Sequence, residues 1–194
     1  MDKKTTKKNE IINASINLMY LHGYNGTSVK DITDAAGIPK GSFYNYFQDK
    51  EHYAVDALYY YYSERIAAFH AILFNKKKKP LDRIKEFFKT GISLAEKQDY
   101  KEGCFLGNMT QEMGNISELI ADAAANIQNE IVSMIHKNLV EASENKELKT
   151  KQNLNTIANF IITSWQGALL RMKVSNDLKV LDDFYTVVTE NLLK

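Results

Sequence analysis

Apolar residues recur at every third or fourth position along most of this chain, which is the spacing of one face of an α-helix. The clearest series runs from Ile120 to Leu139, and Ser117 is placed to cap its helix. Further helices are predicted over residues 8–22, 49–74, 81–98, 104–113, 153–174 and 178–193. No stretch alternates apolar and polar residues as a strand does, and only two prolines and nine glycines interrupt the 194 residues. The predicted fold class is therefore all-α.

Residues 27–50 read TSVKDITDAAGIPKGSFYNYFQDK and predict two short helices joined by a tight turn. Ser28 is placed to cap the first helix, with Asp31 as the acidic partner of a capping box. Gly37 ends that helix. Pro39 suits the first position of the next one, because its φ already fits a helix and it has no N–H to leave unpaired.

The second helix of this pair has an apolar back and a small, basic and aromatic front. Phe43 and Phe47 lie one turn apart and are predicted to point inward. The residues then left on the outer side are Lys40, Gly41, Tyr44 and Asn45. A short helix with an anchored back and such a front is typical of the recognition helix of a helix-turn-helix. The plainer alternative is a helical hairpin with an aromatic core.

The same stretch resembles the DNA-binding signature of the TetR/AcrR family of transcriptional regulators. The matching residues are Thr27, Ser28, Ile32, Ala36, Gly37, Ile38, Gly41, Phe43, Tyr44, Tyr46, Phe47, Lys50 and Glu51. Thr33 stands where the family usually has Ala and Pro39 where it usually has Ser, and neither change disturbs the geometry. So many matches at fixed spacing form a far more specific signal than a short pattern alone.

The resemblance implies a three-helix DNA-binding domain, here residues 1–48, followed by a ligand-binding and dimerisation domain, residues 49–194. The pattern predicts about nine helices, which agrees with what the resemblance implies. The resemblance also implies a homodimer, because the last two helices of family members usually form a four-helix bundle with their copies. We expect Trp165 and Phe184 at or near that interface.

Together, the outer face of the second short helix and the resemblance predict contacts with double-stranded DNA at a pseudo-palindromic operator. The expected DNA-contacting residues are Thr27, Ser28, Lys40, Gly41, Ser42, Tyr44, Asn45, Tyr46 and Lys50. Lysine and tyrosine side chains and a helix N-terminus bind phosphates. Ser42 and Asn45 are best placed to read base edges, since Asn pairs bidentately with adenine, and Gly41 permits close approach.

The charge of the chain restricts this footprint to a local patch. The net charge is only +1, and residues 1–53 carry seven lysines against six acids, which is again +1. Besides Lys40 and Lys50, the basic residues available are Lys3, Lys4, Lys7 and Lys8 of the leading arm. The run Lys76–Pro80 is interpreted as a solvated loop, with a nucleic-acid patch or a targeting signal as the alternatives.

Other function classes fit less well. The four histidines are scattered, and no metal-ligand spacing, nucleophile motif, phosphate loop or dinucleotide fingerprint occurs, so we predict no enzyme, no metal and no cofactor. A small-molecule carrier would explain the C-terminal helices but not the first fifty residues. The single cysteine, the lack of a membrane-length apolar run and the lack of a signal peptide favour a cytoplasmic protein without a membrane partner.

The signal that the chain responds to is predicted to act around Cys104. A lone cysteine is usually a small core hydrophobe. Against this, Cys104 begins a short helix whose dipole favours a thiolate, with Lys97 and Lys101 nearby, and the segment resembles a Gly-Cys step in TetR-family branches that sense electrophiles or oxidants. The alternative is reversible binding of an apolar compound in a pocket lined by Phe105, Asn108, Met109, Glu112 and Trp165. The predicted function is thus a repressor released from its operator by a small molecule or an electrophile.

Overall fold

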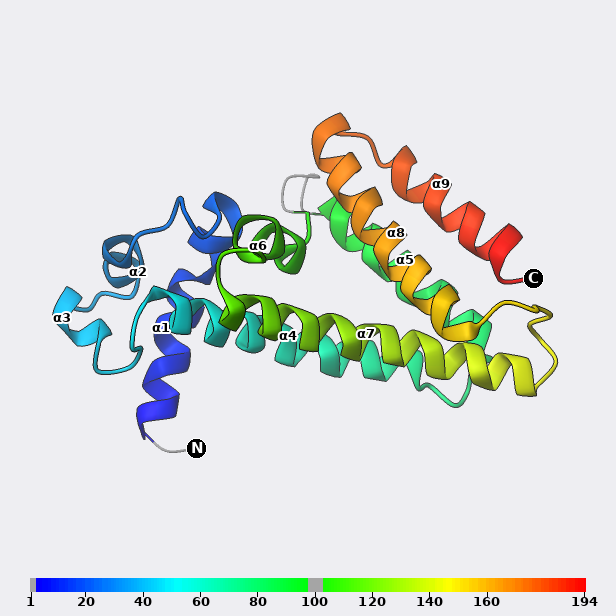
Figure 1. Cartoon of the computed structure of the whole chain (residues 1–194), viewed down its shortest axis with the longest axis horizontal. Coiled ribbons are helices and arrows are strands. Elements are labelled where there is room, and N and C mark those ends of the chain that lie inside the picture. Colours follow the sequence, from blue (N-terminus) through cyan, green and yellow to red (C-terminus); the bar gives the residue numbers. More distant parts are fainter. Residues whose placement is uncertain (1–2, 98–102) are drawn as a thin grey trace. The chain divides into compact units, whose positions relative to one another are not determined.

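The computed structural model describes residues 3–97 and 103–194, and every regular element within these ranges is a helix (Figure 1). The elements are α1 (Lys3–His22), α2 (Val29–Ala35), α3 (Lys40–Phe43), α4 (Lys50–Leu73), α5 (Pro80–Lys97), α6 (Phe105–Met113), α7 (Glu118–Glu144), α8 (Leu154–Ser175), α9 (Lys179–Val187) and the π-helical turn η1 (Val188–Leu192). The all-α prediction is confirmed. No helix in the described ranges has the length and apolar character needed to cross a membrane.

Three predicted helix starts, those of α2, α4 and α7, are confirmed by hydrogen bonds between a side chain and a nearby backbone N–H. Ser28 and Asp31 form the complete capping box of α2. The Asp49 carboxylate accepts a hydrogen bond from the backbone N–H of His52 at 2.9 Å, at the start of α4. Ser117 accepts one from the N–H of Ile120 at the start of α7. Each cap satisfies N–H groups that would otherwise lack a partner.

Helix α1 begins earlier than the apolar pattern indicated, at Lys3 instead of residue 8. The added residues are polar, so they carry no apolar stripe, but none of them breaks a helix. Lys7 and Glu10, three positions apart, form an ion pair of 2.9 Å on the exposed side. The sequence pattern located the buried part of the helix, whereas its solvated first turns leave no such pattern.

The chain divides into two compact units. The first contains Met1–Glu64 and Phe105–Ile127, and the second contains Arg65–Cys104 and Gln128–Lys194. The predicted boundary after residue 48 marks the end of the helix-turn-helix, but the compact unit around it also includes α6 and the first parts of α4 and α7. Because α4 and α7 are long, each contributes residues to both units.

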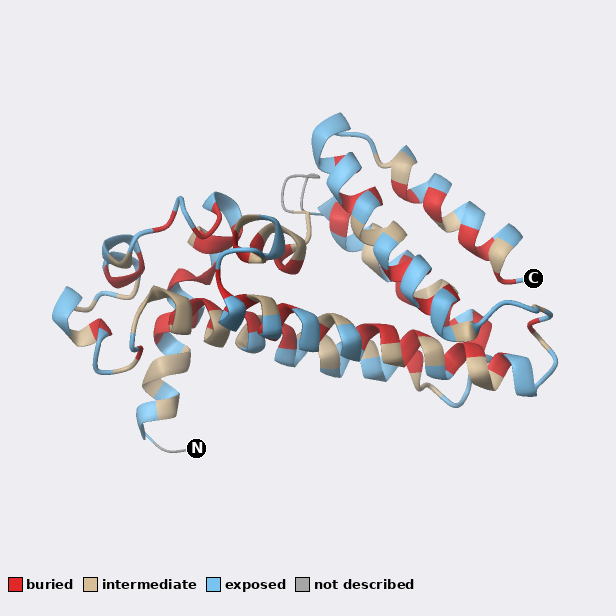
Figure 2. Ribbon diagram, in the orientation of Figure 1, coloured by how far each residue is buried: buried red, intermediate tan, exposed pale blue. Residues whose placement is uncertain are grey.

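The second unit has an aromatic core built by α5, α8 and α9. The rings of Phe88, Trp165 and Phe184 lie 5.1 to 5.3 Å apart, centroid to centroid. Gly91 makes room for the indole, because a Cβ at position 91 would lie 2.8 Å from it. Buried residues recur at helical spacing along α8 and α9, so each helix has one buried side and one exposed side (Figure 2).

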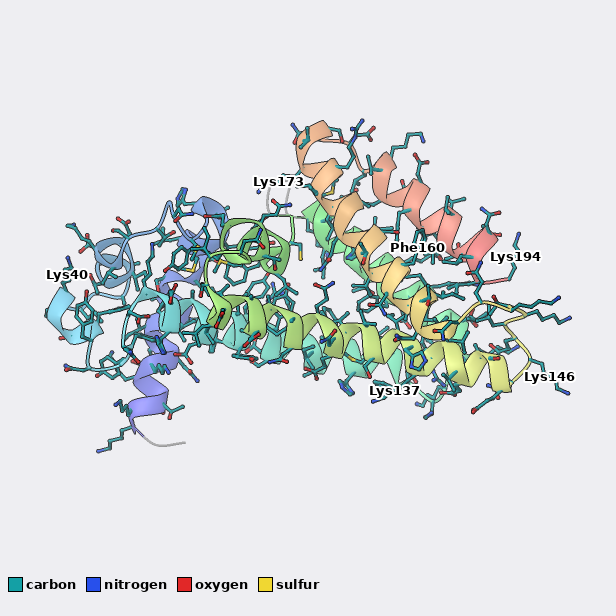
Figure 3. All side chains as sticks on the ribbon, in the orientation of Figure 1. Lys40, Lys137, Lys146, Phe160, Lys173 and Lys194 are labelled. Carbon is teal, nitrogen blue, oxygen red and sulfur yellow. The ribbon has the colours of Figure 1, made fainter. Side chains whose placement is uncertain are left out.

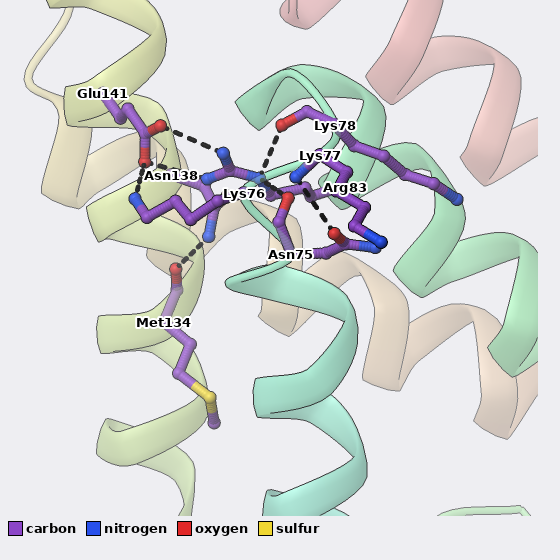
Figure 4. Close-up of polar contacts among 8 residues, drawn as sticks. All are labelled: Asn75, Lys76, Lys77, Lys78, Arg83, Met134, Asn138 and Glu141. Carbon is purple, nitrogen blue, oxygen red and sulfur yellow. Dashed lines mark hydrogen bonds and ion pairs between the residues drawn. The ribbon is translucent and has the colours of Figure 1, made fainter.

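A buried arginine joins the α4–α5 loop to α7 in the same unit (Figure 4). Arg83 is 2% exposed, and its Nε donates to the carbonyls of Asn75 and Lys78, both at 2.9 Å. Its two terminal nitrogens donate to the carboxylate of Glu141 at 2.8 and 3.1 Å. Lys76 pairs with the same carboxylate at 3.2 Å, while the lysines of residues 76–79 stay exposed. The run is a loop with exposed lysines, as predicted, and its backbone is held by Arg83.

Candidate nucleic-acid interface

The turn of the helix-turn-helix depends on a positive φ. Helix α2 ends at Ala35, with Ala36 as its C-cap, and Gly37 follows with φ +63°, a conformation that only glycine adopts without strain. The N–H of Ile38 then donates to the carbonyl of Thr33 at 3.0 Å, which closes the turn. Hydrogen bonds from the side chain and the backbone N–H of Ser28 lower the pKa of Asp31, so the capping carboxylate stays charged at neutral pH.

Helix α3 is shorter than predicted and begins one residue later. Pro39 has φ −61° but ψ 143°, so it occupies the cap position before the helix instead of the first helical position. Regular α-helix covers Lys40–Phe43, and the chain continues as a turn in which the N–H groups of Tyr46 and Phe47 both donate to the carbonyl of Phe43 at 3.0 Å. The proposed recognition segment is therefore one helical turn plus this hydrogen-bonded turn.

Three rings anchor the back of this segment, as predicted for Phe43 and Phe47. These two are 0% and 2% exposed, with ring centroids 5.0 Å apart, and Tyr53 from α4 lies 5.1 Å from Phe47. The Tyr53 hydroxyl shares a 2.7 Å hydrogen bond with Ser15 of α1. Burial raises the pKa of Tyr53 to about 12, so the phenol stays neutral. Helix α3 is thereby fixed to α1 and α4.

The front of the segment is open to solvent. The exposed residues are Lys40, Gly41, Tyr44 and Asn45, whereas Ser42 and Tyr46 are half-buried. Lys40 projects from α3 (Figure 3), and the Tyr44 ring is 54% exposed. A Cβ added at Gly41 would meet no described atom within 4 Å, so the packing of the chain gives no reason for a glycine there. This surface is small, polar and accessible, as base readout requires.

Three residues predicted to bind phosphates make hydrogen bonds within the chain. Lys50 donates to the carbonyls of Tyr24 and Thr27 at 3.0 and 3.1 Å, and its ammonium lies 4.0 Å from the centroid of the Tyr24 ring. Burial lowers the pKa of Lys50, and the charge of Glu112 opposes that shift. Thr27 is buried, and its hydroxyl donates to the carbonyl of Gly23.

The third is Ser28, whose hydroxyl is engaged with Asp31 in the capping box. The Ser28 cap follows from the local sequence, but no short-range pattern reveals the contacts of Lys50, which reaches a carbonyl 26 residues away. In the leading arm, Lys8 is paired with Asp56 of α4, whereas Lys3 and Lys4 are exposed. Lys40 is thus the cation best presented next to the recognition segment.

The residues predicted to line a ligand pocket are distributed over both units. Phe105 and Met109 are fully buried, and the Phe105 ring packs against Tyr20 and Tyr61 in the first unit. Trp165 lies in the aromatic core of the second unit. Cys104 and Asn108 are half-buried, and Lys101, thought to act on the thiol, lies outside the described residues.

Glu112, the remaining pocket candidate, binds backbone N–H groups of the α1–α2 connection. Among the residues that the structure describes, no group of three His, Cys, Asp or Glu side chains is arranged to hold a metal ion.

Comparison with known protein families gives two matches. Residues 11–54 match the family described as "Bacterial regulatory proteins, tetR family". Residues 80–188 match "Tetracyclin repressor-like, C-terminal domain". The two matched ranges cover the helix-turn-helix and most of the helices that follow α4.

Similar proteins extend over nearly the whole chain. The HTH-type transcriptional repressor DhaR of Mycobacterium sp. (strain GP1) is 32% identical over 190 residues, which cover 98% of this chain and 94% of that protein. A TetR regulatory protein from Rhodobacter sphaeroides has the same fold, with a TM-score of 0.85 and 24% identity over 93% of this chain and 96% of its own. The reduced form of E. coli NemR matches with a TM-score of 0.86 and 22% identity, over 95% and 96%.

Proposed function

The chain belongs to the TetR family of bacterial regulatory proteins, and on this premise we propose that it is a repressor that leaves its operator when a small molecule binds or reacts. It is a DNA-binding transcriptional regulator. The main observation behind the proposal is that residues 40–45 expose Lys40, Tyr44 and Asn45 to solvent. The opposite side of the same segment is fixed by the buried rings of Phe43 and Phe47. The repressor activity of DhaR, which is similar along its whole length, supports the same direction of control.

In the proposed mechanism, the segment from Lys40 to Tyr46 enters a major groove. Lys40 and the hydroxyls of Tyr44 and Tyr46 pair with phosphates, and Gly41 lets the backbone approach the duplex. Asn45, and Ser42 beside it, read base edges. Lys50 and Thr27 support this surface from inside, and the exposed start of α2 at Ser28 is the part of that region able to meet a phosphate.

Replacing Lys40 or Asn45 by alanine should have two different effects. Lys40→Ala should weaken binding to every duplex alike and lower the slope of log affinity against log salt concentration by about one, because one phosphate contact is lost. Asn45→Ala should cost about 1–3 kcal/mol at one base pair and relax the preference there. Gel shifts at two salt concentrations measure both effects.

Lys137→Ala is the matched control, because it removes the same charge from an exposed position on α7 (Figure 3). The duplex comes from footprinting the DNA upstream of the protein's own gene, confirmed by selection from a random library. If Lys40→Ala and Asn45→Ala both bind this duplex like Lys137→Ala, the recognition segment has been assigned to the wrong residues.

The protein should act as a two-fold dimer, because one short recognition segment spans too few base pairs for specific binding. Phe184 and Trp165, the residues expected at the interface, pack inside their own unit. The outer side of α8 instead exposes Phe160 and Val174 at 57% and 77%, with Gly167 midway between them in steps of seven residues. Val187 of α9 is also 53% exposed. These residues form an apolar stripe of the kind that pairs helices.

Phe160→Asp combined with Val174→Asp should therefore give a monomer at micromolar concentration and weaken operator binding by at least about tenfold, because the second half-site is lost. Sedimentation velocity and gel shifts measure the two effects. Leu94→Asp places one such charge at an apolar side chain of α5 that is 52% exposed and serves as the control for each single substitution. A parent protein that sediments as a monomer and still binds the operator specifically would rule out the proposed dimer.

The effector is proposed to act at the start of α6. Cys104 is half-buried directly before Phe105, the first residue of that helix. Two chemistries remain: an adduct of the thiol with an electrophile or oxidant, or reversible binding of an apolar molecule beside Phe105 and Met109. The mass of the intact protein after exposure to an alkylating agent, compared with operator release under the same conditions, distinguishes them.

A further inference from the structure

The connection between α1 and α2 is held by a carboxylate from a distant part of the chain. Glu112, on α6, accepts hydrogen bonds from the backbone N–H of Tyr24 at 3.3 Å and from that of Asn25 at 2.9 Å. The side-chain amide of Asn25 donates to the same carboxylate at 3.3 Å. Hydrogen bonds to a charged acceptor are stronger than those between neutral groups. Glu112 therefore binds two successive peptide units of the DNA-binding domain.

The residue before these peptides is shaped to admit the carboxylate. Gly23 has φ +76°, and a Cβ at position 23 would lie 1.9 Å from Oε1 of Glu112. A side chain there would be strained by the backbone and would also occupy the space of the carboxylate. Glycine at this position thus serves the contact with α6 as well as the end of α1.

The same peptides are bound from their carbonyl side by Lys50. The carbonyl of Tyr24 accepts from the Lys50 ammonium, and so does the carbonyl of Thr27, the residue immediately before the cap of α2. An anion thus binds the N–H groups of the connection and a cation binds its carbonyls. These contacts form one continuous series from α6 to the first residue of the helix-turn-helix, all within the first compact unit.

We propose that Glu112 is a positioning residue for operator recognition: its carboxylate holds the α1–α2 connection, and thereby the start of α2, in the geometry that binds DNA. Loss of this contact lowers affinity for the operator without unfolding the protein. The inference rests on the proposed function. It adds to that proposal the atoms that connect α6, where the effector is proposed to act, to the DNA-binding surface.

Two variants and one control test this role in the full-length protein. Glu112→Ala removes all three acceptor contacts, whereas Glu112→Gln keeps the shape and one acceptor oxygen but not the charge. Gln111→Ala truncates the neighbouring exposed side chain of α6 and leaves the contacts intact. The measurements are the Kd for the operator duplex, the Kd for a scrambled duplex of equal length, the melting temperature, and hydrogen exchange at the amides of Tyr24 and Asn25.

We expect the Kd of Glu112→Ala for the operator to rise at least about tenfold, with a smaller rise for Glu112→Gln and none for Gln111→Ala. Affinity for the scrambled duplex should change less than about twofold, because phosphate contacts elsewhere are untouched. The two amides should exchange at least about tenfold faster in Glu112→Ala, while the melting temperature stays at that of Gln111→Ala.

The inference is overturned if Glu112→Ala binds the operator like the parent, or if affinities for both duplexes fall together with the melting temperature. The second result would show that Glu112 only supports folding. A parent protein that does not distinguish the operator from the scrambled duplex contradicts the proposed function itself and the inference with it. If only the expected effect of Glu112→Ala is missing, the inference fails and the proposed function is unaffected.

Discussion

Phe47→Ala should lower the free energy of unfolding by about 3–5 kcal/mol and abolish operator binding at concentrations that saturate the parent protein. Phe47 is 2% exposed and lies between the rings of Phe43 and Tyr53. Truncation removes most of its apolar surface and leaves a cavity behind α3 that the surrounding rings fill only in part. Both the position of the recognition segment and the stability of its unit depend on this ring.

Urea unfolding followed by circular dichroism measures the loss, and a gel shift measures binding. Phe47→Leu retains most of the apolar volume and should cost less than roughly half as much. The only tryptophan, Trp165, lies in the second unit, so its fluorescence reports on that unit separately. Full operator affinity in Phe47→Ala would show that the aromatic anchor does not position α3.

The second large effect is expected at Glu141. Glu141→Ala should destabilise the protein by about 3 kcal/mol, because the buried guanidinium of Arg83 loses its counter-charge and two of its hydrogen-bond acceptors. The value is at the low end for a buried pair, since the Glu141 side chain is 31% exposed and water screens part of the interaction. Urea unfolding followed by Trp165 fluorescence is the measurement, because both residues lie in the second unit.

Arg83→Met provides the decisive comparison. It replaces the guanidinium by an apolar chain of similar length, so no buried charge is left unpaired. The double variant Arg83→Met with Glu141→Ala should therefore be more stable than Glu141→Ala alone. Equal stability of the two would mean that the unpaired guanidinium costs no more than the two loop carbonyl contacts of its Nε contribute.

The same pair predicts a pH dependence. Hydrogen bonds from Arg83, and then from Lys76, lower the pKa of Glu141 below its ordinary value of 4.5. A carboxylate whose folded pKa is depressed stabilises the fold fully above its unfolded pKa, and this contribution is lost as the pH falls through the folded value. Stability measured from pH 6 downwards should thus decline less steeply in Glu141→Gln than in the parent protein.

The features that sequence reasoning located correctly depend on neighbours along the chain. The capping box of Ser28 and Asp31 spans three residues, and Gly37 is needed by the turn that contains it. The inward direction of Phe43 and Phe47 follows from the helical period together with the family signature. Such contacts form wherever the local sequence allows them, so they can be predicted without knowledge of the fold.

The interface on the last two helices marks the limit of that reasoning. Periodicity identified apolar stripes on α8 and α9 but did not separate the stripe that packs within the chain from the one left exposed. Trp165 and Phe184 were expected at or near the interface, and the structure packs their rings against Phe88 within the second unit. The side chains that remain exposed are Phe160 and Val174.

The amino-acid sequence was sufficient for the all-α class, the family and the turn between α2 and α3, because helical period, caps and the turn glycine act over a few residues. The tertiary structure alone decided how the polar side chains around that segment are used. Lys50 bonds to carbonyls 23 and 26 residues away, and Glu112 binds N–H groups 87 and 88 residues away. A charged side chain has the same local pattern whether it faces solvent or a distant peptide, so only the folded chain distinguishes a phosphate ligand from an internal contact.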